Sequence, residues 1–255
     1  MMHLNIKNCL ELIFPSNIYC IACGSIIDQS RPYALCDRCI RLFHWTNGRT
    51  CQKCGKILQD SYIHDFCIDC RDTGHFFEKG YACVQYGIYE RDLLLSFKYG
   101  GKSYIGRKIA EIMADRVAAE EDLLVDLILP VPMHRAKQKK RGYNQAEIIA
   151  KYLAELLCTP HSGKLLLRTA KTPAMSRLRP EERRNNMENA FSIAPGAEKR
   201  IEGKRILLVD DIFTTGSTAD ACSNTLLNAG ASEVRLICFA SGANNLQSKI
   251  EYRAE

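Results

Sequence analysis

The sequence lacks any apolar stretch long enough to cross a membrane. No run of 18 or more apolar residues occurs among its 255 residues, whereas a membrane-spanning helix needs about 20. The first 15 residues mix polar and apolar side chains, so they also lack the continuous apolar segment of a secretory signal peptide. We therefore expect a short amphipathic helix at this end, no membrane span, and a cytoplasmic protein.

The residue patterns of acyl-transfer enzymes are missing as well. No order of Ser, His and Asp, and no pairing of Cys with His, indicates a nucleophile beside its base. Disorder is not predicted either, because 46% hydrophobic and 25% charged residues are ordinary for a globular protein. The length suits one sizeable core with a small appended module.

What the sequence does have is a concentration of positive charge in its middle. The net charge is +6, and the segment from His134 to Arg184 carries 13 Lys and Arg against 4 Asp and Glu. The remainder of the chain is therefore slightly acidic. A single basic tract favours a polyanionic ligand, either a pyrophosphate or a nucleic acid, although for any one lysine a solvated charged face is an equally good interpretation.

Eight cysteines form an internal repeat near the start of the chain. Each copy follows the spacing C-x2-C-x12-C-x2-C, and the second copy lies 31 residues after the first. The cysteines are Cys20, Cys23, Cys36, Cys39, Cys51, Cys54, Cys67 and Cys70. Paired C-x2-C knuckles, each with a glycine after the first pair at Gly24 and Gly55, are typical of tetrahedral four-thiolate zinc sites.

Other readings of the cysteines are weaker. A disulfide framework needs an oxidising compartment, and iron–sulfur ligation usually has less even spacing. Four thiolates leave no coordination position for water, so the zinc is expected to be structural. Equal spacing favours one ion per copy and about two ions in all, while a cross-braced pairing of Cys20 and Cys23 with Cys51 and Cys54 remains open.

After residue 75 the pattern changes to alternating strands and helices. Strands are expected at 81–87, 125–130, 164–168, 206–209 and 233–240, with helices at 89–99, 103–119, 144–157 and 215–229. Such alternation predicts an α/β fold with a mostly parallel sheet and helices on both faces. We expect a cysteine-rich zinc module over 1–75 and an α/β domain over 80–245, with a long loop at 169–180.

The segment ILLVDDIFTTGST, residues 206–218, is the most informative of this second domain. A buried strand leads into Asp210 and Asp211, at the edge where open α/β sheets bind ligands. The turn that follows offers hydroxyls and free N–H groups at a helix start, where the helix dipole favours an anion. Its residues are Thr214, Thr215, Gly216, Ser217 and Thr218. An ordinary helix cap needs only one such residue, so we interpret the segment as a sugar-phosphate site.

This segment resembles the phosphoribosyl pyrophosphate (PRPP) loop of type I phosphoribosyltransferases. The resemblance implies that the acidic pair holds the ribose hydroxyls and that the TTGST turn holds the 5′-phosphate. In such a protein the basic stretch after Pro132 receives pyrophosphate. Arg141 is the best candidate there, because a guanidinium grips two phosphate oxygens and Gly142 lets the backbone approach.

Together these motifs resemble the ComF family, competence-associated proteins with a zinc module followed by a type I phosphoribosyltransferase domain. The match rests on the CxxC pairs, FKYGG at 97–101, PVP at 130–132, RGYNQA at 141–146, the R-x2-N-x3-AF pattern from Arg183 to Phe191, and LLVDDIFTTGST. The family often has a glutamine where this chain has Met175. In that loop Lys171, Thr172 and Arg177 remain to hydrogen-bond a ligand.

The resemblance implies binding of PRPP with Mg²⁺ and a role in the uptake of transforming single-stranded DNA with competence proteins. In one hypothesis the chain is a transferase: Asp210 and Asp211 stabilise the positive charge that develops on the ribose, pyrophosphate leaves toward Arg141 and Lys98, and an unknown acceptor attacks. In another it only binds PRPP or DNA phosphates. A salvage or amide-transferring enzyme is the third and weakest reading. We expect single-stranded DNA to bind alongside PRPP, with an affinity that falls as salt rises.

Overall fold

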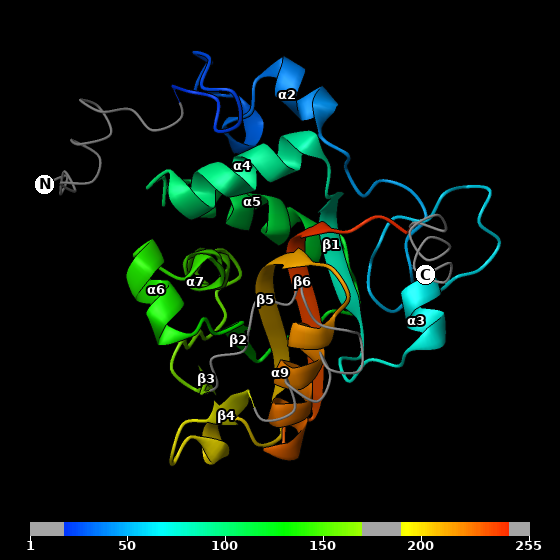
Figure 1. The fold of residues 1–255 in the computed structure, drawn as a ribbon, viewed down its shortest axis with the longest axis vertical. Helices are drawn as coiled ribbons and strands as arrows, with labels where there is room; N and C mark the ends of the chain where they lie inside the picture. The colour runs from blue at the N-terminus through cyan, green and yellow to red at the C-terminus, as the bar shows by residue number, and fades with distance from the viewer. Residues whose placement is uncertain (1–17, 170–189, 245–255) are drawn as a thin grey trace, which may run out of the picture.

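The structure is a computed structural model that describes residues 18–169 and 190–244. Its centre is a four-stranded parallel sheet in the order β1-β6-β5-β2 (Figure 1). The strands are β1 Gly80–Gln85, β2 Leu127–Pro130, β5 Arg205–Phe213 and β6 Glu233–Ser241. The predicted α/β fold with a parallel sheet and helices is confirmed.

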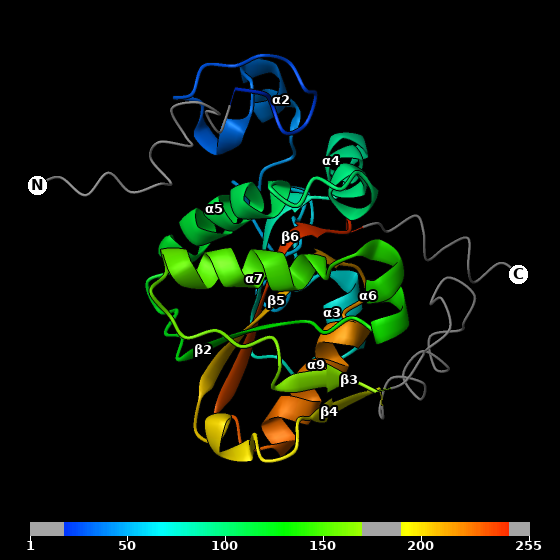
Figure 2. The same ribbon diagram turned by 90° about the vertical axis from the view of Figure 1, so that its left-hand side faces the viewer.

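Helices cover both faces of the sheet, as Figures 1 and 2 show. On one face lie α4 (Ile88–Tyr99), α5 (Ile105–Ala118) and α7 (Gln145–Leu156), and on the other lies α9 (Ser217–Asn228). Successive side chains of a strand point to opposite faces. Leu207 and Val209 of β5 therefore pack with α5 and α7, whereas Ile206 and Leu208 pack with α9.

Two parts of the fold differ from the prediction. The strand at 166–168, β3 (Leu166–Arg168), does not join the parallel sheet; it pairs antiparallel with β4 (Phe191–Ile193). The basic stretch after Pro132, which is not among the predicted helices, contains a helix, α6 (Arg135–Arg141). A helix that is solvated all round has no apolar stripe, so periodicity could not reveal it.

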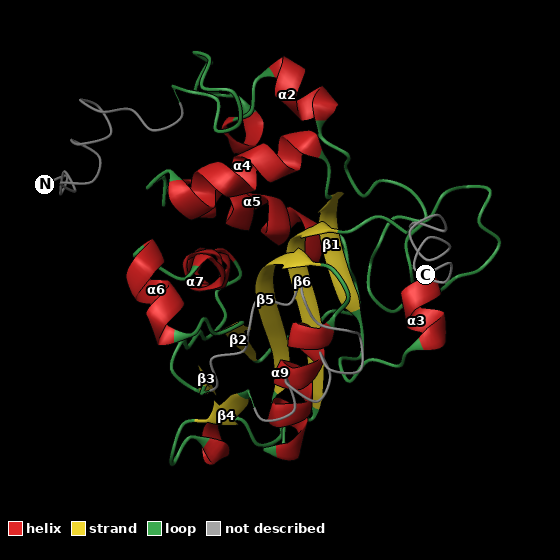
Figure 3. Ribbon diagram, in the orientation of Figure 1, coloured by secondary structure: helices red, strands yellow, loops and turns green. Residues whose placement is uncertain are grey.

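The two cysteine repeats fold as two separate units, one against each layer of the core. The first ribbon, residues 18–43, contains η1 (Pro32–Ala34) and α2 (Asp37–Leu42), and its buried residues join the core beneath α4 and α5. The second ribbon, residues 49–72, contains α3 (Ile68–Asp72), and its buried residues join the core beneath α9. Figure 3 shows the ribbons as mostly loop segments at different sides of the sheet.

Candidate functional site

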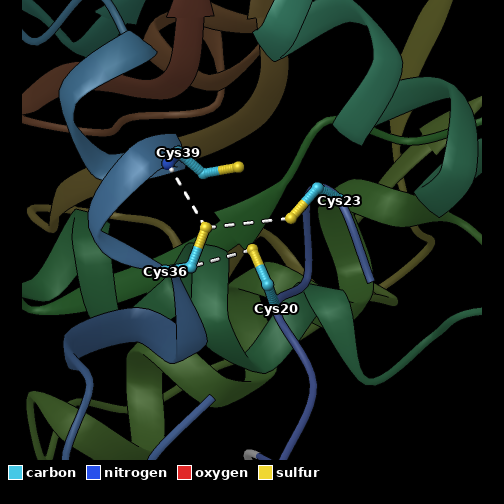
Figure 4. Close-up of side chains that lie close together, drawn as sticks. All are labelled: Cys20, Cys23, Cys36 and Cys39. Carbon is cyan, nitrogen blue, oxygen red and sulfur yellow. Dashed lines mark hydrogen bonds between the residues drawn. The ribbon is translucent and has the colours of Figure 1, made fainter. Parts of the chain in front are cut away.

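Each cysteine repeat gathers its own four thiols. The sulfurs of Cys20, Cys23, Cys36 and Cys39 lie within 4.8 Å of one another, as do those of Cys51, Cys54, Cys67 and Cys70. Figure 4 shows the first cluster, in which the Sγ atoms of Cys23 and Cys36 are 3.7 Å apart. Four thiolates at tetrahedral spacing are the donor set of structural zinc, and the pairing within each copy excludes the cross-braced arrangement for these residues.

Backbone N–H groups contact a cysteine sulfur at the equivalent place in both clusters. The N–H of Cys36 lies 3.5 Å from Sγ of Cys20, and at the equivalent place the N–H of Cys67 lies 3.2 Å from Sγ of Cys51. Such contacts partly neutralise the negative charge of the thiolates. The thiols and their surroundings therefore fit one Zn²⁺ per ribbon.

The acidic pair lies inside β5 rather than after it. Strand β5 continues to Phe213 because β6 pairs with it along this whole length, with Asp210 opposite Cys238, whereas β2 ends at Pro130 opposite Val209. Asp210 and Asp211 thus lie beyond the end of β2, where β5 has no strand partner on that side among the described residues. Because they are neighbours in a strand, they face opposite layers of the molecule.

The two carboxylates differ in their electrostatic surroundings. Asp211 forms an ion pair with Lys98, from the end of α4, and both side chains are largely buried. Burial in the cavity, and secondly the negative charge of Asp211, raise the pKa of Asp210 from the usual 3.8 to about 8. At neutral pH the carboxyl group of Asp210 in the free protein is therefore largely protonated.

The turn after β5 forms a small cavity of about 40 Å³. Gly216 has a φ of +84°, and Ser217 begins α9 without any side chain capping the helix. The first N–H groups of a helix have no acceptor within it, so those of α9 remain open to an anion. Thr215 Oγ1 and Ser217 Oγ lie 3.1 Å apart. The cavity is lined by all five predicted residues, Thr214, Thr215, Gly216, Ser217 and Thr218, and by Asp210.

A second cavity, of about 180 Å³, adjoins the first and shares Asp210 and Thr218 with it. The predicted residues Lys98, Arg141 and Asp211 line it. So do two cations that the sequence analysis did not single out, Lys137 and Arg168. Partial burial lowers the pKa of Lys137, and the positive charges of Arg141, Lys98 and Arg168 lower it further. Such mutual repulsion is expected where several cations lie close together without a bound anion.

The motifs PVP and RGYNQA form one wall of this cavity. The side-chain amide of Asn144 donates to the carbonyl of Val131 at 3.0 Å, which ties the start of α7 to the end of β2. Arg141 donates to Gln145 Oε1 at 2.8 Å and to the hydroxyl of Tyr99 at 3.1 Å. Lys139 and Lys140, in contrast, are exposed and do not line the cavity. The predicted loop residues Lys171, Thr172 and Arg177 lie outside the described residues.

Each half of the chain matches a known domain family. Residues 9–71 match the double zinc ribbon domain family, and residues 139–253 match the phosphoribosyl transferase domain family. Competence protein F of Haemophilus influenzae is 29% identical over 86% of this chain and 95% of its own. DNA utilization protein YhgH of Escherichia coli K12 is 25% identical (81% and 90%), and competence protein ComFC of Bacillus subtilis is 24% identical (84% and 90%).

A membrane-spanning helix is not found in the part of the chain that the structure describes, because no helix there combines the required length with sufficient apolar character.

Proposed function

We propose that this chain, which belongs to the ComF family, is a competence-related protein that binds Mg²⁺-PRPP in the two adjoining cavities at the end of β5. One observation carries the proposal. A narrow cavity of hydroxyls and free N–H groups meets a wider cavity with four cations; Asp210 lines both cavities, and Asp211 lines the wider one. This order matches the order of 5′-phosphate, ribose and pyrophosphate along PRPP.

Each part of the ligand has a chemically suited partner in this arrangement. The turn from Thr214 to Thr218 takes the 5′-phosphate, as helix N-termini commonly do. The side chains of Asp210 and Asp211 accept the ribose hydroxyls or face the cation, and Asp210 gives up its proton when the positively charged cation binds beside it. The pyrophosphate meets the cations of the wider cavity, which are Lys98, Lys137, Arg141 and Arg168. When bound, Mg²⁺ supplies further charge neutralisation at the phosphates.

The ion pair between Lys98 and Asp211 gives the site two arrangements. Without ligand, Lys98 neutralises Asp211. When pyrophosphate enters, its greater charge attracts Lys98, and Asp211 is released for the ribose. If the glycosidic bond then breaks, the positive charge on the ribose lies beside Asp211 while the leaving group remains among the cations. The reaction that this geometry supports is phosphoribosyl transfer, and the acceptor is unassigned.

The test is a calorimetric titration of Mg²⁺-PRPP into the wild-type protein and into Asp210→Asn/Asp211→Asn. We expect affinity to fall by several kcal/mol, because hydrogen bonds to charged groups contribute about 1.5 to 3 kcal/mol each. Asp92→Asn is the control, since that carboxylate pairs with Arg91 on the exposed side of α4. Equal affinity of the double variant and the wild type would contradict the proposal.

A second function, binding of single-stranded DNA, is favoured by the surface beside the wider cavity. Tyr99 is 71% exposed and Tyr104 is 56% exposed, and the guanidinium of Arg141 lies 5.0 Å from the centre of the Tyr99 ring. Exposed aromatic rings among cations are what unstacked bases require. Lys98 points into the cavity while its neighbour Tyr99 remains outside, so the two ligands need not compete.

Fluorescence anisotropy of labelled single-stranded DNA, with and without saturating Mg²⁺-PRPP, tests this second function. We expect binding that weakens as salt rises, is lost in part with Tyr99→Ala, and is kept with Tyr99→Phe, which retains the ring. Complete displacement of DNA by PRPP would exclude simultaneous binding. No binding at low salt would exclude a direct role on the strand.

A further inference from the structure

The phosphate-binding turn, residues 214–218, packs directly against the segment that follows the second ribbon in the chain. The ring of His75 lies so close to Gly216 that a Cβ at that position would be 2.6 Å from Cε1 of His75. The left-handed φ of +84° and this contact both require glycine. The ring of Phe213, the last residue of β5, also lies close to this point, 3.1 Å from the Cβ position.

His75 is fixed by a hydrogen bond and by ring packing. Its Nδ1 lies 2.8 Å from Oδ2 of Asp220, one turn into α9, and the other oxygen of that carboxylate accepts the N–H of Phe76 at 3.1 Å. The imidazole is 1% exposed. It stacks on Phe77 at 4.7 Å and meets Phe213 edge-on at 6.0 Å. The start of α9 is therefore tied at two points to residues 75 and 76.

The same aromatic cluster continues into the zinc-binding knuckles. Lys56, only 3% exposed, pairs with Asp69 at 2.8 Å and lies 5.7 Å from the centre of the Phe213 ring. Lys56 follows the first knuckle of the second ribbon, and Asp69 lies within the second knuckle, between Cys67 and Cys70. This ion pair thus joins both knuckles of the second cluster to Phe213, the residue just before the phosphate-binding turn.

We infer that the second zinc ribbon holds the phosphate-binding turn in its binding conformation, with His75 as a positioning residue, so that zinc at the second cluster and a sugar phosphate at the turn stabilise each other. The first ribbon packs with α4 and α5 on the other layer and has no part in this coupling. The inference rests on the proposed function for the identity of the ligand, but the mechanical link stands on the contacts above.

Reciprocity of coupled binding supplies the test. Cys39→Ser removes a ligand of the first cluster and Cys70→Ser removes the ligand at the same place in the second. In Cys39→Ser, a zinc-selective chelator is titrated with and without saturating ribose 5-phosphate. We expect the ligand to raise the chelator concentration needed to remove the remaining second-cluster zinc about tenfold. In Cys70→Ser, which retains only the first cluster, we expect no change.

A milder pair of variants keeps the test open if a cysteine variant does not fold. Asp220→Asn weakens the link between α9 and His75, whereas Tyr33→Phe removes the 2.5 Å bond from Tyr33 to Asp115 that links the first ribbon to α5. Without any ligand, Asp220→Asn should speed hydrogen exchange of the amides at 214–219, and it should weaken ribose 5-phosphate binding about tenfold. Tyr33→Phe should alter neither.

The outcomes separate the inference from the proposed function. Unchanged exchange at 214–219 in Asp220→Asn, or equal effects from Tyr33→Phe, would overturn the inference even if PRPP binds. Failure of the wild type to bind either ribose 5-phosphate or PRPP would overturn the proposed function, while the exchange measurement still decides whether the second ribbon supports the turn.

Discussion

The two zinc ribbons share one spacing of ligands but occupy different environments. In the first ribbon Cys23 is exposed and Cys36 is half-buried, whereas the equivalent Cys54 and Cys67 of the second are buried. Gly24 and Gly55 have nearly the same positive φ, yet a Cβ at Gly24 would meet nothing, and one at Gly55 would lie 2.6 Å from the carbonyl oxygen of Gly80. The ligand spacing therefore determines the metal site, while its surroundings determine what the ribbon supports.

The residues between the ligands carry this difference. Lys56 and Asp69, which pair beneath the phosphate turn, correspond in the first copy to Ser25 and Arg38. The hydroxyl of Ser25 instead lies 3.1 Å from the thiol of Cys23, at the surface. The first ribbon is thus an outer layer on α5, and the second is part of the support of the candidate site.

The largest effect is expected from breaking each cluster at the same ligand. Cys67→Ser should lower the free energy of unfolding by about 5 kcal/mol or more, since it removes a zinc ligand and leaves a polar group in the core shared with α9. Cys36→Ser should be less destabilising and should leave PRPP affinity unchanged. Metal analysis should show about two zinc ions in the wild type and about one in each variant.

Thermal unfolding of these variants checks the comparison. If Cys36→Ser and Cys67→Ser destabilise the protein equally, the second ribbon is no more integrated than the first. If Cys36→Ser weakens PRPP binding as much as Cys67→Ser, the two faces of the sheet are not independent.

A matched glycine pair isolates packing from metal binding. Gly24→Ala should lower stability by about 1 kcal/mol, the cost of a left-handed conformation for a residue with a Cβ. Gly55→Ala carries the same cost together with a clash against the backbone of β1, so we expect about 3 kcal/mol or more. Unfolding by urea at equal zinc content measures both. Similar losses at the two positions would show that β1 moves away readily.

The last comparison is between Asp210 and Asp211, successive residues of β5 whose side chains point to opposite faces of the sheet. The pKa of Asp210 is about 8 in the folded protein and near 3.8 when unfolded. Its contribution to stability is therefore full below about pH 4 and is lost as the pH rises through about 8. Asp210→Asn should then stabilise the free protein by on the order of 2 kcal/mol at pH 8.5 and hardly at all at pH 4.

Asp211→Asn is the matched variant on the other face. It removes the partner of Lys98 and should give no gain at either pH. Melting temperatures at the two pH values decide between these expectations. A pH-independent effect of Asp210→Asn would mean that Asp210 is ionised throughout.

Sequence predicted the local features of the site well, and those that depend on long-range contacts poorly. The knuckles and the turn at 214–218 consist of neighbouring residues whose chemistry is visible in a short segment. Lys137 and Arg168 come from a solvated helix and a short antiparallel strand, and only the folded chain brings them together. Their residue types are common on any surface, so no local pattern could mark them.

His75 shows the same limit more sharply. A histidine beside a zinc module has no local signal for its contact with Asp220, which lies 145 residues away in the chain. Strand β5 was likewise predicted to end at Val209, because the apolar run ends there. Pairing with β6 extends it through the acidic pair to Phe213, and this pairing depends on a strand more than 20 residues later in the chain.

The order of the strands has a consequence for how the chain folds during synthesis. Strand β1, which follows the ribbons, has β6 as its neighbour in the sheet, and β6 is the last strand in the described part of the chain; Gly80 lies opposite Leu236. The zinc knuckles leave the ribosome before α9 and β6, and their apolar side toward α9 stays uncovered until about 150 further residues have been made. Pairing between strands so far apart in the chain predicts slow folding. In the interval before β6 is made, binding of a chaperone or early binding of zinc would protect the nascent chain from aggregation.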